Sequence, residues 1–295
     1  MAVIPPVVLT IAGFDPCSGA GITADIKTIA AHECYGVACI TALTIQSTRG
    51  VQRVVGVDPK IVAETLQELV SDLAVEAVHI GMLGNERVVA VVADFLGGFP
   101  GQTSPGKVRL PHVVLDPILK SSSGADLLDA AGTRLLIERL LPLAQLVTPN
   151  LDEASALTGI AVTNLDQMRE AADCLHSLGA ANVVVTGGHL EKAIDLLSFT
   201  TARGIEKEVF KADRQHSNAT HGTGCAFATA LACHLAHGRG LPEAVLLSKA
   251  YVSAAIANAY PLGKGAGPLH HLYRMGQQRR PSAIISETEH VHSRN

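Results

Sequence analysis

The segment Thr220–Cys225 combines a glycine-rich turn with the start of a predicted helix, and this pattern can bind phosphate. Residues 226–237, which follow it, are rich in Ala and Leu and favour a helix. Gly222 and Gly224 let the backbone approach a ligand closely. The first N–H groups of a helix lack intrahelical partners and the helix dipole favours an anion there, so the segment suits a transferring phosphoryl group. The alternative is a glycine-rich loop that only begins a helix.

Cys225 stands at the predicted N-terminus of that helix, where the pKa of a thiol can be lowered toward neutrality. We therefore expect Cys225 either to accept the proton of a substrate hydroxyl or to orient that hydroxyl. No two cysteines form a Cys-x-x-Cys pair, so a structural zinc site has little support. The candidate catalytic residues are Gly222, Thr223, Gly224 and Cys225.

A second glycine-rich segment, 101–107, matches most of a P-loop. Val108 follows it where the magnesium-binding hydroxyl of a P-loop is required. A P-loop also joins a strand to a helix, whereas this segment is predicted to join a helix to a strand. We expect an ordinary surface loop.

The composition favours a packed enzyme over a nucleic-acid or membrane protein. The 295 residues are 47% hydrophobic and 17% charged, which suits a large globular core. A net charge of −4, no Trp and only 3% aromatic residues argue against a nucleic-acid partner. No apolar run reaches the roughly 18 residues of a membrane span, and the N-terminus does not resemble a signal peptide. The expected location is the reducing cytoplasm.

Short β-branched runs alternate with helical patterns, which predicts a mainly parallel sheet with helices on both faces. The predicted strands are 7–11, 37–45, 77–80, 113–115, 146–147 and 183–185, with a hairpin over 194–200 and 205–210. The predicted helices begin near 22, 59 and 151 or span 86–95, 127–141, 165–178, 223–237 and 242–259. No linker or repeat divides the chain, so we expect one domain over 1–275 and a flexible polar tail over 276–295.

Many motifs occur in the order of one known family. They are Leu9–Gly21, Ala24–Thr28, Ile40–Thr48, Ile80–Leu83, Val114–Pro117, Thr148–Ala154, Gly187–His189, His221–Cys225 and Gly263–His271. On these motifs the chain resembles the hydroxymethylpyrimidine/phosphomethylpyrimidine kinases of thiamine biosynthesis, within the ribokinase-like superfamily, over residues 7–273.

The resemblance implies a three-layer α/β fold and a kinase that uses ATP and Mg²⁺. Its substrate would be 4-amino-5-hydroxymethyl-2-methylpyrimidine, phosphorylated first to the monophosphate and then to the diphosphate. Relatives commonly form homodimers, which makes a second copy of the chain an expected partner. Two rival functions are a pyridoxine or pyridoxal kinase and a pyrimidine-binding sensor without catalysis.

Four residues are candidates for binding the pyrimidine. Gln46 offers an amide donor and acceptor that match an aminopyrimidine edge. Met82 can place its thioether on a flat ring, although core packing is the rival interpretation. Gly13 and Asp15 follow a strand end, where α/β proteins bind ligands, and Asp15 either bonds the substrate or organises the loop.

Five further residues are candidates on the nucleotide side. Asp116 and Glu153 follow strands and suit the hydrated shell of Mg²⁺, although Asp116 could instead only brace its loop. Asn150 is a candidate ATP contact or a plain helix cap. Lys249 matches a family position near the nucleotide, although a lone helix Lys is more often solvated, and Thr186 stands where relatives commonly carry Lys.

One departure within the superfamily bears on the substrate. Many ribokinase-like kinases place Asp where Cys225 stands, whereas the pyrimidine branch uses Cys, which supports a pyrimidine substrate.

Overall fold

A single mixed sheet forms the centre of the protein. The structure, a computed structural model, describes residues 4–99, 102–104, 107–109, 111–188, 193–213, 215, 217 and 219–275. Within these residues the sheet has nine strands in the order β11-β10-β9-β8-β7-β4-β1-β2-β3. They are β1 (Val7–Phe14), β2 (Tyr35–Ser47), β3 (Gly50–Gly56), β4 (Val75–Ile80), β7 (His112–Leu115), β8 (Leu146–Val147), β9 (Asn182–Gly187), β10 (Ala193–Thr201) and β11 (Gly204–Ala212).

The neighbouring strands in the middle of the sheet, β9, β8, β7, β4, β1 and β2, run parallel to one another. Their carboxyl ends therefore meet along one edge of the sheet. The outer strands β3, β10 and β11 pair antiparallel with their neighbours. The expected hairpin is therefore confirmed as β10 and β11, with Gly204 at φ 116° after its turn.

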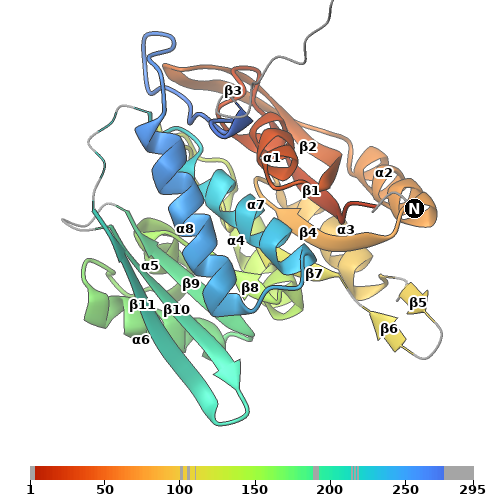
Figure 1. Cartoon of the computed structure of the whole chain (residues 1–295). Helices are drawn as coiled ribbons and strands as arrows, with labels where there is room; N and C mark the ends of the chain where they lie inside the picture. Colours follow the sequence, from red (N-terminus) through yellow and green to blue (C-terminus); the bar gives the residue numbers. More distant parts are fainter. Residues whose placement is uncertain are drawn as a thin grey trace, which may run out of the picture.

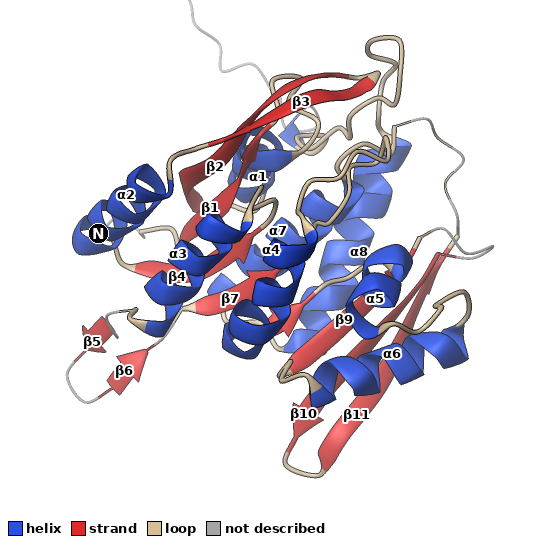
Figure 2. Cartoon of the chain, turned by 180° about the vertical axis from the view of Figure 1, so that it is seen from behind, coloured by secondary structure: helices blue, strands red, loops and turns tan. Residues whose placement is uncertain are grey.

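Helices cover both faces of the sheet (Figures 1 and 2). The layer in front in Figure 1 contains α1 (Gly21–Ala31), α7 (Thr223–Ala236) and α8 (Leu241–Ala257). The opposite layer contains α2 (Pro59–Asp72), α3 (Glu86–Gly97), α4 (Ala130–Leu135), α5 (Leu151–Thr158) and α6 (Leu165–Ser177). A separate hydrophobic core fills the space between the sheet and each layer. The predicted three-layer α/β fold is confirmed.

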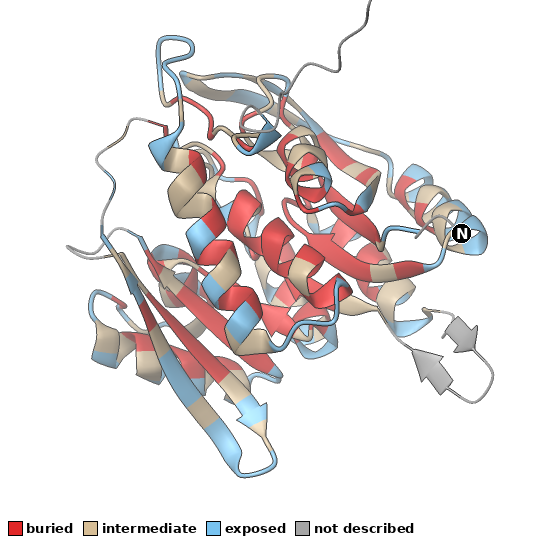
Figure 3. Cartoon of the chain, viewed as in Figure 1, coloured by how far each residue is buried: buried red, intermediate tan, exposed pale blue. Residues whose placement is uncertain are grey.

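Helix α7 lies deepest in its layer, as Figure 3 shows by its almost continuous burial. Its Ala-rich sequence explains this position, because small side chains let a helix pack closely against the sheet and against α1 and α8. The first turn of α7 is therefore held rigidly at the carboxyl edge of the sheet.

Local signals fixed several helix ends as expected. The Asp58 side chain accepts the N–H of Lys60 at 2.9 Å, and Pro59 occupies the first turn of α2. Asn150 and Glu153 form a capping box at the start of α5.

Two expectations were wrong or incomplete. The predicted helix 127–141 is instead α4, a π-helical turn (Leu136–Leu140) and a 3-10 turn (Leu141–Leu143). The Asp129 side chain caps Gly132, which delays the start, and Pro142 lacks the N–H needed to continue an α-helix. Strand β3 was not predicted, because Gly50 and the polar residues around it hide its alternation.

The P-loop-like segment contains two short antiparallel strands, β5 (Gln102–Ser104) and β6 (Lys107–Arg109). The next element is β7 and not a helix, so rejection of a P-loop is confirmed for the described part of this segment. The predicted tail, 276–295, lies outside the described residues. No helix in the described part of the chain is long and apolar enough to cross a membrane.

Candidate active site

A cavity of about 1410 Å³ opens at the carboxyl ends of the parallel strands. All of the candidate site residues named from the sequence line it, although they come from distant parts of the chain. They are Gly13, Asp15, Gln46, Met82, Asp116, Asn150, Glu153, Thr186, Gly222, Thr223, Gly224, Cys225 and Lys249. The parallel topology brings them together because each follows, or lies near, a strand end at one edge.

The turn before α7 depends on glycine at one position. Gly222 caps α7 with a left-handed backbone, φ 82°, and a Cβ there would overlap the carbonyl oxygen of Gly19. At Gly224 an added Cβ would lie 3.8 Å from Asp116 Oδ2, which is ordinary contact. Glycine is thus required at position 222 by the backbone, whereas a Cβ at position 224 would fit in ordinary contact with Asp116.

The Cys225 thiol lies where the N-termini of α1 and α7 meet, because it accepts the N–H of Gly21. Burial, and then the charges of Asp116 and Asp25, raise the pKa of the Cys225 thiol well above its usual range. The expectation of a lowered pKa is wrong, because burial and the two carboxylates outweigh the helix N-terminus. Cys225 is therefore a thiol, and this state favours orienting a hydroxyl over deprotonating it.

Asp15 organises the loop between β1 and α1. Its carboxylate accepts the N–H groups of Cys17 at 2.9 Å, Gly19 at 3.2 Å and Ala20 at 3.0 Å, and it lies 2.8 Å from His221 Nε2. Burial opposes ionisation, but the hydrogen bonds from His221 and from the loop outweigh it and lower the pKa of Asp15 to about 2. This geometry favours the loop-organising alternative for Asp15.

His221 was quoted in a motif but had no predicted role. Its Nε2 lies 3.1 Å from Gln46 Nε2, and its Nδ1 lies 3.5 Å from Ser122 Oγ. The Gln46 carbonyl oxygen accepts the Thr44 hydroxyl at 3.1 Å. His221 therefore connects the Asp15 loop to the candidate pyrimidine-binding amide. The feature of the sequence that could have marked His221 as a site residue is its position directly before Gly222.

Met82 lies against Gly13 on the wall of the cavity. A Cβ on Gly13 would come within 2.8 Å of Met82 Sδ, so Gly13 makes room for the thioether. Met82 also packs with Ala42 and Leu127 in a small apolar cluster. Met82 is therefore compatible with both core packing and contact with a flat ring, because it packs in this cluster and also lines the cavity.

Asp116 and Glu153 are two buried carboxyls on one side of the cavity. Burial, followed by the charge of Glu153, raises the pKa of Asp116 well above its usual range. Burial raises the pKa of Glu153 to about 7, although its Oε2 accepts the N–H of Asn150 at 2.9 Å. Two buried carboxyls that repel each other are suited to a cation, which would relieve both charges.

Lys249 is buried and forms an ion pair with Asp195, with Nζ and Oδ2 2.6 Å apart. The other oxygen of Asp195 accepts the N–H of Gly187 at 3.1 Å, and Thr186 lies opposite Asp195 in the sheet. Asp195 was missed, although it is the charged residue inside the apolar run of β10. Asn150 both caps α5 and lines the cavity.

A buried polar network forms the floor of the cavity and was also missed. Asp25 accepts hydroxyl hydrogen bonds from Thr10 at 2.7 Å and Thr229 at 2.9 Å. His79 Nδ1 lies 3.5 Å from Asp25, and burial is outweighed by this carboxylate, which raises the pKa of His79. Because Thr229 lies on α7 one turn after Cys225, this network fastens α7 to α1 and to the sheet.

Comparison with known sequences agrees with this arrangement. The family model described as phosphomethylpyrimidine kinase matches residues 15–270. A hydroxymethylpyrimidine/phosphomethylpyrimidine kinase of Streptomyces coelicolor is 40% identical over 276 residues, covering 93% of this chain and 97% of that protein. The thiamine biosynthesis bifunctional protein ThiED of Geobacter sulfurreducens is 44% identical over 90% of this chain, which spans 52% of that longer protein.

Solved structures agree as well. A phosphomethylpyrimidine kinase from Clostridium difficile has a TM-score of 0.72 and 35% identity, with 85% of this chain and 99% of that chain covered. A pyridoxal kinase from Bacillus subtilis, solved with ADP, has a TM-score of 0.80 and 33% identity, with 92% and 99% covered. The resemblance noted from the motifs is confirmed, as is the kinase class, and the chain belongs to the phosphomethylpyrimidine kinase family.

Proposed function

We propose that this protein transfers the γ-phosphoryl group of ATP to the hydroxymethyl group of 4-amino-5-hydroxymethyl-2-methylpyrimidine. The same site then phosphorylates the monophosphate to the diphosphate. The observation that carries this proposal is that one cavity holds both the first turn of α7, with Cys225, and the Gln46–Met82 wall. A phosphate-binding end and a heterocycle-binding end thus share one space.

At the substrate end, Gln46 and Met82 supply complementary contacts. The Gln46 amide pairs with the amino group and a ring nitrogen of the pyrimidine, in place of its contacts with Thr44 and His221. The Met82 thioether lies on the ring face. Gly13 leaves room for the Met82 sulfur, and Asp15 holds the loop that follows β1.

At the transfer end, the backbone N–H groups of Gly222, Thr223 and Gly224 bind the phosphoryl group and stabilise the charge that spreads over its oxygens. Cys225 orients the attacking hydroxyl. Because its pKa is raised, positioning is its main contribution, and phosphoryl transfer depends chiefly on positioning and charge stabilisation.

Asp116 and Glu153 would hold Mg²⁺, largely through water, because both carboxyls face the cavity and burial raises the pKa of each, which a cation would reverse. When bound, Mg²⁺ neutralises the charge of the ATP phosphates. Asn150 and Thr186 line the ATP side of the cavity, and Lys249, oriented by Asp195, is the phosphate-facing cation there.

We also propose that residues 1–275 act as one domain in a cytoplasmic homodimer. The continuous nine-stranded sheet supports a single domain, and six free cysteines suit a reducing compartment. Leu43, Ile45 and Val55 are exposed apolar residues on β2 and β3, which supports an interface there.

Pyridoxal kinase is the second candidate function. Pyridoxal kinases are among the similar solved structures, including one from Staphylococcus aureus in complex with AMP-PCP and pyridoxal, with a TM-score of 0.78 and 30% identity. The non-catalytic sensor is less well supported, because the residues suited to phosphate and Mg²⁺ binding line the same cavity.

Product analysis with ATP, Mg²⁺ and the pyrimidine alcohol tests the proposal. We expect the monophosphate to appear first and the diphosphate to follow, with one ADP released for each step. Asp116→Asn should abolish turnover, whereas Asp94→Asn, at a surface ion pair with Arg139 that does not line the cavity, should not affect it. Turnover of pyridoxal but not of the pyrimidine would refute the substrate assignment, and tight pyrimidine binding without ADP release would favour the sensor.

A further inference from the structure

Three side chains beside Gln46 bring three kinds of metal ligand together. Asp15 and Cys17 lie in the loop between β1 and α1, and His221 directly precedes Gly222. One carboxylate oxygen of Asp15, the Cys17 sulfur and one ring nitrogen of His221 all lie within 4.8 Å of one another. Asp15 and His221 are 206 positions apart, so no short sequence motif marks this set.

The three ligand types favour a transition metal ion over Mg²⁺. Zinc binds carboxylate oxygen, imidazole nitrogen and thiolate sulfur at roughly 2.0–2.3 Å in a tetrahedral arrangement. Ligand atoms around such an ion are roughly 3–4 Å apart, so donors within 4.8 Å of one another can close on it by small side-chain movements. Mg²⁺ prefers oxygen ligands and keeps much of its water, so it would not use the sulfur.

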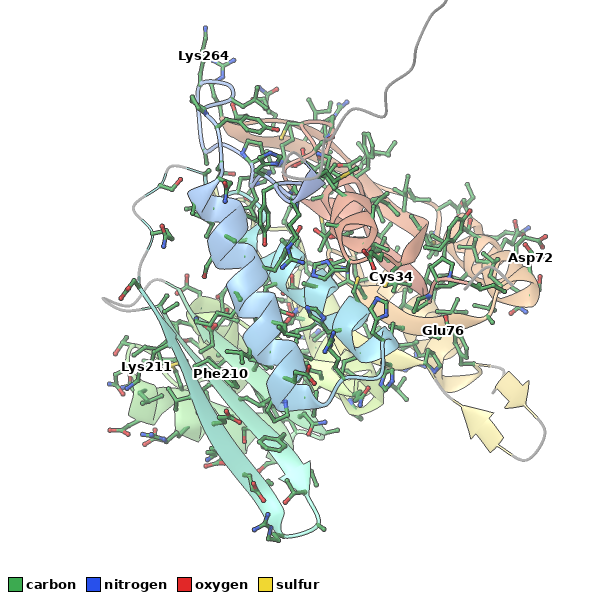
Figure 4. The ribbon with its side chains drawn as sticks, in the orientation of Figure 1. Cys34, Asp72, Glu76, Phe210, Lys211 and Lys264 are labelled. Atoms are coloured by element: carbon green, nitrogen blue, oxygen red, sulfur yellow. The ribbon has the colours of Figure 1, made fainter. Side chains whose placement is uncertain are left out.

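The fold holds two of these ligands in position. The backbone of His221 is anchored by the loop that carries Lys264 (Figure 4), because its N–H donates to the Gly267 carbonyl oxygen at 3.3 Å. The His221 ring lies against Gly19, where an added Cβ would overlap the ring. The Asp15 carboxylate is fixed by three loop N–H groups. An ion would therefore meet a largely preformed site.

Asp15 and His221 can both release a lone pair to an ion at low cost. A carboxylate has about four lone-pair positions, and Asp15 uses three of them for loop N–H groups, so only its contact with His221 must give way. His221 Nε2 lies 2.8 Å from Asp15 Oδ2, which requires a proton on Nε2, and 3.1 Å from the Gln46 amide nitrogen, which requires a lone pair. No protonation state of Nε2 satisfies both neighbours, so exchanging its proton for an ion sacrifices at most one hydrogen bond.

An ion can reach the cluster from the cavity. Asp15 and His221 line the cavity, and Cys17 is partly exposed. Burial, followed by the neighbouring Asp15 carboxylate, raises the pKa of the Cys17 thiol to about 11, so this sulfur is protonated until an ion binds. Coordination reverses this preference, because a bound dication deprotonates a coordinating thiol.

We propose that Asp15, Cys17 and His221 form an inhibitory Zn²⁺ site at the substrate end of the cavity. Zn²⁺ binds one Asp15 oxygen, the Cys17 sulfur and His221 Nε2, and it keeps one water as the fourth ligand. The Cys17 proton leaves to solvent, and the His221 proton moves to Nδ1, which lies 3.5 Å from Ser122 Oγ. The ion and its water then lie beside Gln46 and exclude the pyrimidine. This competition rests on the proposed kinase function, whereas metal binding does not.

Cobalt(II) tests the site without a kinase assay. Co²⁺ uses the same ligand types, and a thiolate ligand gives it an intense sulfur-to-cobalt charge-transfer band in the near ultraviolet. Titration of the full chain with Co²⁺ should produce this band, and one equivalent of Zn²⁺ should remove it. Cys17→Ser should abolish the band, whereas Cys174→Ser, at another partly exposed cysteine, should leave it unchanged.

Steady-state kinetics test the inhibition. In excess Mg²⁺ and ATP, free Zn²⁺ buffered at about ten times its dissociation constant should raise the KM for the pyrimidine alcohol about tenfold, with little change in kcat. Cys17→Ser should match the wild type in zinc-free buffer, because Cys17 does not line the cavity, and this turnover also reports that the variant is folded. Its inhibition constant for Zn²⁺ should be at least about tenfold higher than that of the wild type.

A cobalt spectrum without the charge-transfer band, or a band that survives Cys17→Ser, would overturn the metal site. Zn²⁺ inhibition that excess pyrimidine alcohol does not relieve would overturn the placement of the ion at the substrate end. A chain that shows the Cys17-dependent band but never turns over the alcohol would contradict the proposed kinase function and still support the metal site. Cys17→Ala provides a second test of the sulfur ligand and should lose the same band.

Discussion

The charges around Cys225 determine what this residue can do. A helix N-terminus favours a thiolate, yet burial disfavours one, and the charges of Asp116 and Asp25 add to the effect of burial on the pKa of Cys225. The same helix N-terminus is then free to favour a different anion, the phosphoryl group. We infer that the positive end of α7 acts on the phosphate and that Cys225 acts as a neutral hydrogen-bonding group beside it.

Substitution of Cys225 distinguishes positioning from proton transfer. Cys225→Ala should lower kcat by on the order of 10²-fold with little change in KM for the alcohol. Cys225→Ser should stay within about tenfold of the wild type, because its hydroxyl can still orient the substrate. Steady-state kinetics with both variants would check this, and an equally large loss of kcat in the serine variant would instead indicate a required thiolate.

Glu153 should make stability depend on pH near neutrality. Its pKa is raised from 4.5 to about 7, so the folded protein holds this proton more tightly than the unfolded chain does. This contribution to stability is complete below about pH 4.5 and is lost as the pH rises through 7. Relative to Glu153→Gln, the wild-type free energy of unfolding should therefore fall by up to about 3 kcal/mol between pH 4.5 and 8.

Urea denaturation at several pH values measures this difference. Gln retains the capping contact with Asn150, so the comparison isolates the charge. A constant difference between the two proteins across this range would show that Glu153 is not protonated in the folded state.

At the scale of elements, the turn before α7 interlocks with the loop before α1. Gly222 has φ 82° and lies against the Gly19 carbonyl, while the Gly21 N–H reaches the Cys225 sulfur. Both helices therefore start at the same place, and each loop fixes the position of the other.

Paired glycine substitutions separate backbone strain from this contact. Gly222→Ala combines left-handed strain with overlap on Gly19 and should cost about 3 kcal/mol or more of stability, with loss of turnover. Gly238→Ala, at φ 79° with open space around it, should cost only about 1–2 kcal/mol. Thermal unfolding and kinetics measure both effects, and equal destabilisation by the two variants would contradict the interlocking of the loops.

The ion pair between α8 and β10 offers a similar comparison. Lys249→Met leaves Asp195 buried without its cation and should cost about 3–5 kcal/mol. Lys207→Met removes the partner of the partly exposed Asp173 and should cost less than about 1 kcal/mol. Chemical denaturation checks the difference, and a similar loss in both variants would mean that Lys249 is effectively solvated.

Local sequence signals predicted those features whose cause is local. Asp58-Pro59 placed the start of α2, and short β-branched apolar runs placed the parallel strands. The polar floor of the cavity could not be predicted in this way, because Thr229 bonds Asp25 across 204 positions and His221 meets Asp15 across 206. The raised pKa of Cys225 was missed for the same reason, since its neighbours become apparent only after folding.

At the scale of the whole molecule, the alternating side chains of β2 line the cavity on one face of the strand and form an exposed apolar surface on the other. Thr44 and Gln46 line the cavity, while Leu43 and Ile45 point to the opposite face. Leu43 pairs with Val55 on β3, so the exposed residues form one apolar patch at the edge of the sheet. Such a patch beside an edge strand is a natural interface for a second copy of the chain.

Charge substitution in this patch tests the proposed homodimer. Leu43, Ile45 and Val55 are 48%, 46% and 46% exposed, and a dimer that covers them would bury a carboxylate introduced there. Leu43→Glu should therefore raise the dimer Kd at least tenfold, about 1.4 kcal/mol, as measured by sedimentation velocity.

Leu246→Glu, on α8 and 55% exposed, is the matched control and should leave the Kd unchanged. A monomeric wild-type protein would refute the homodimer, and dissociation caused by Leu246→Glu but not by Leu43→Glu would place the interface elsewhere. Because Leu43 alternates with the cavity-facing Thr44, a Leu43→Glu monomer that retains turnover would also show that each copy holds a complete active site.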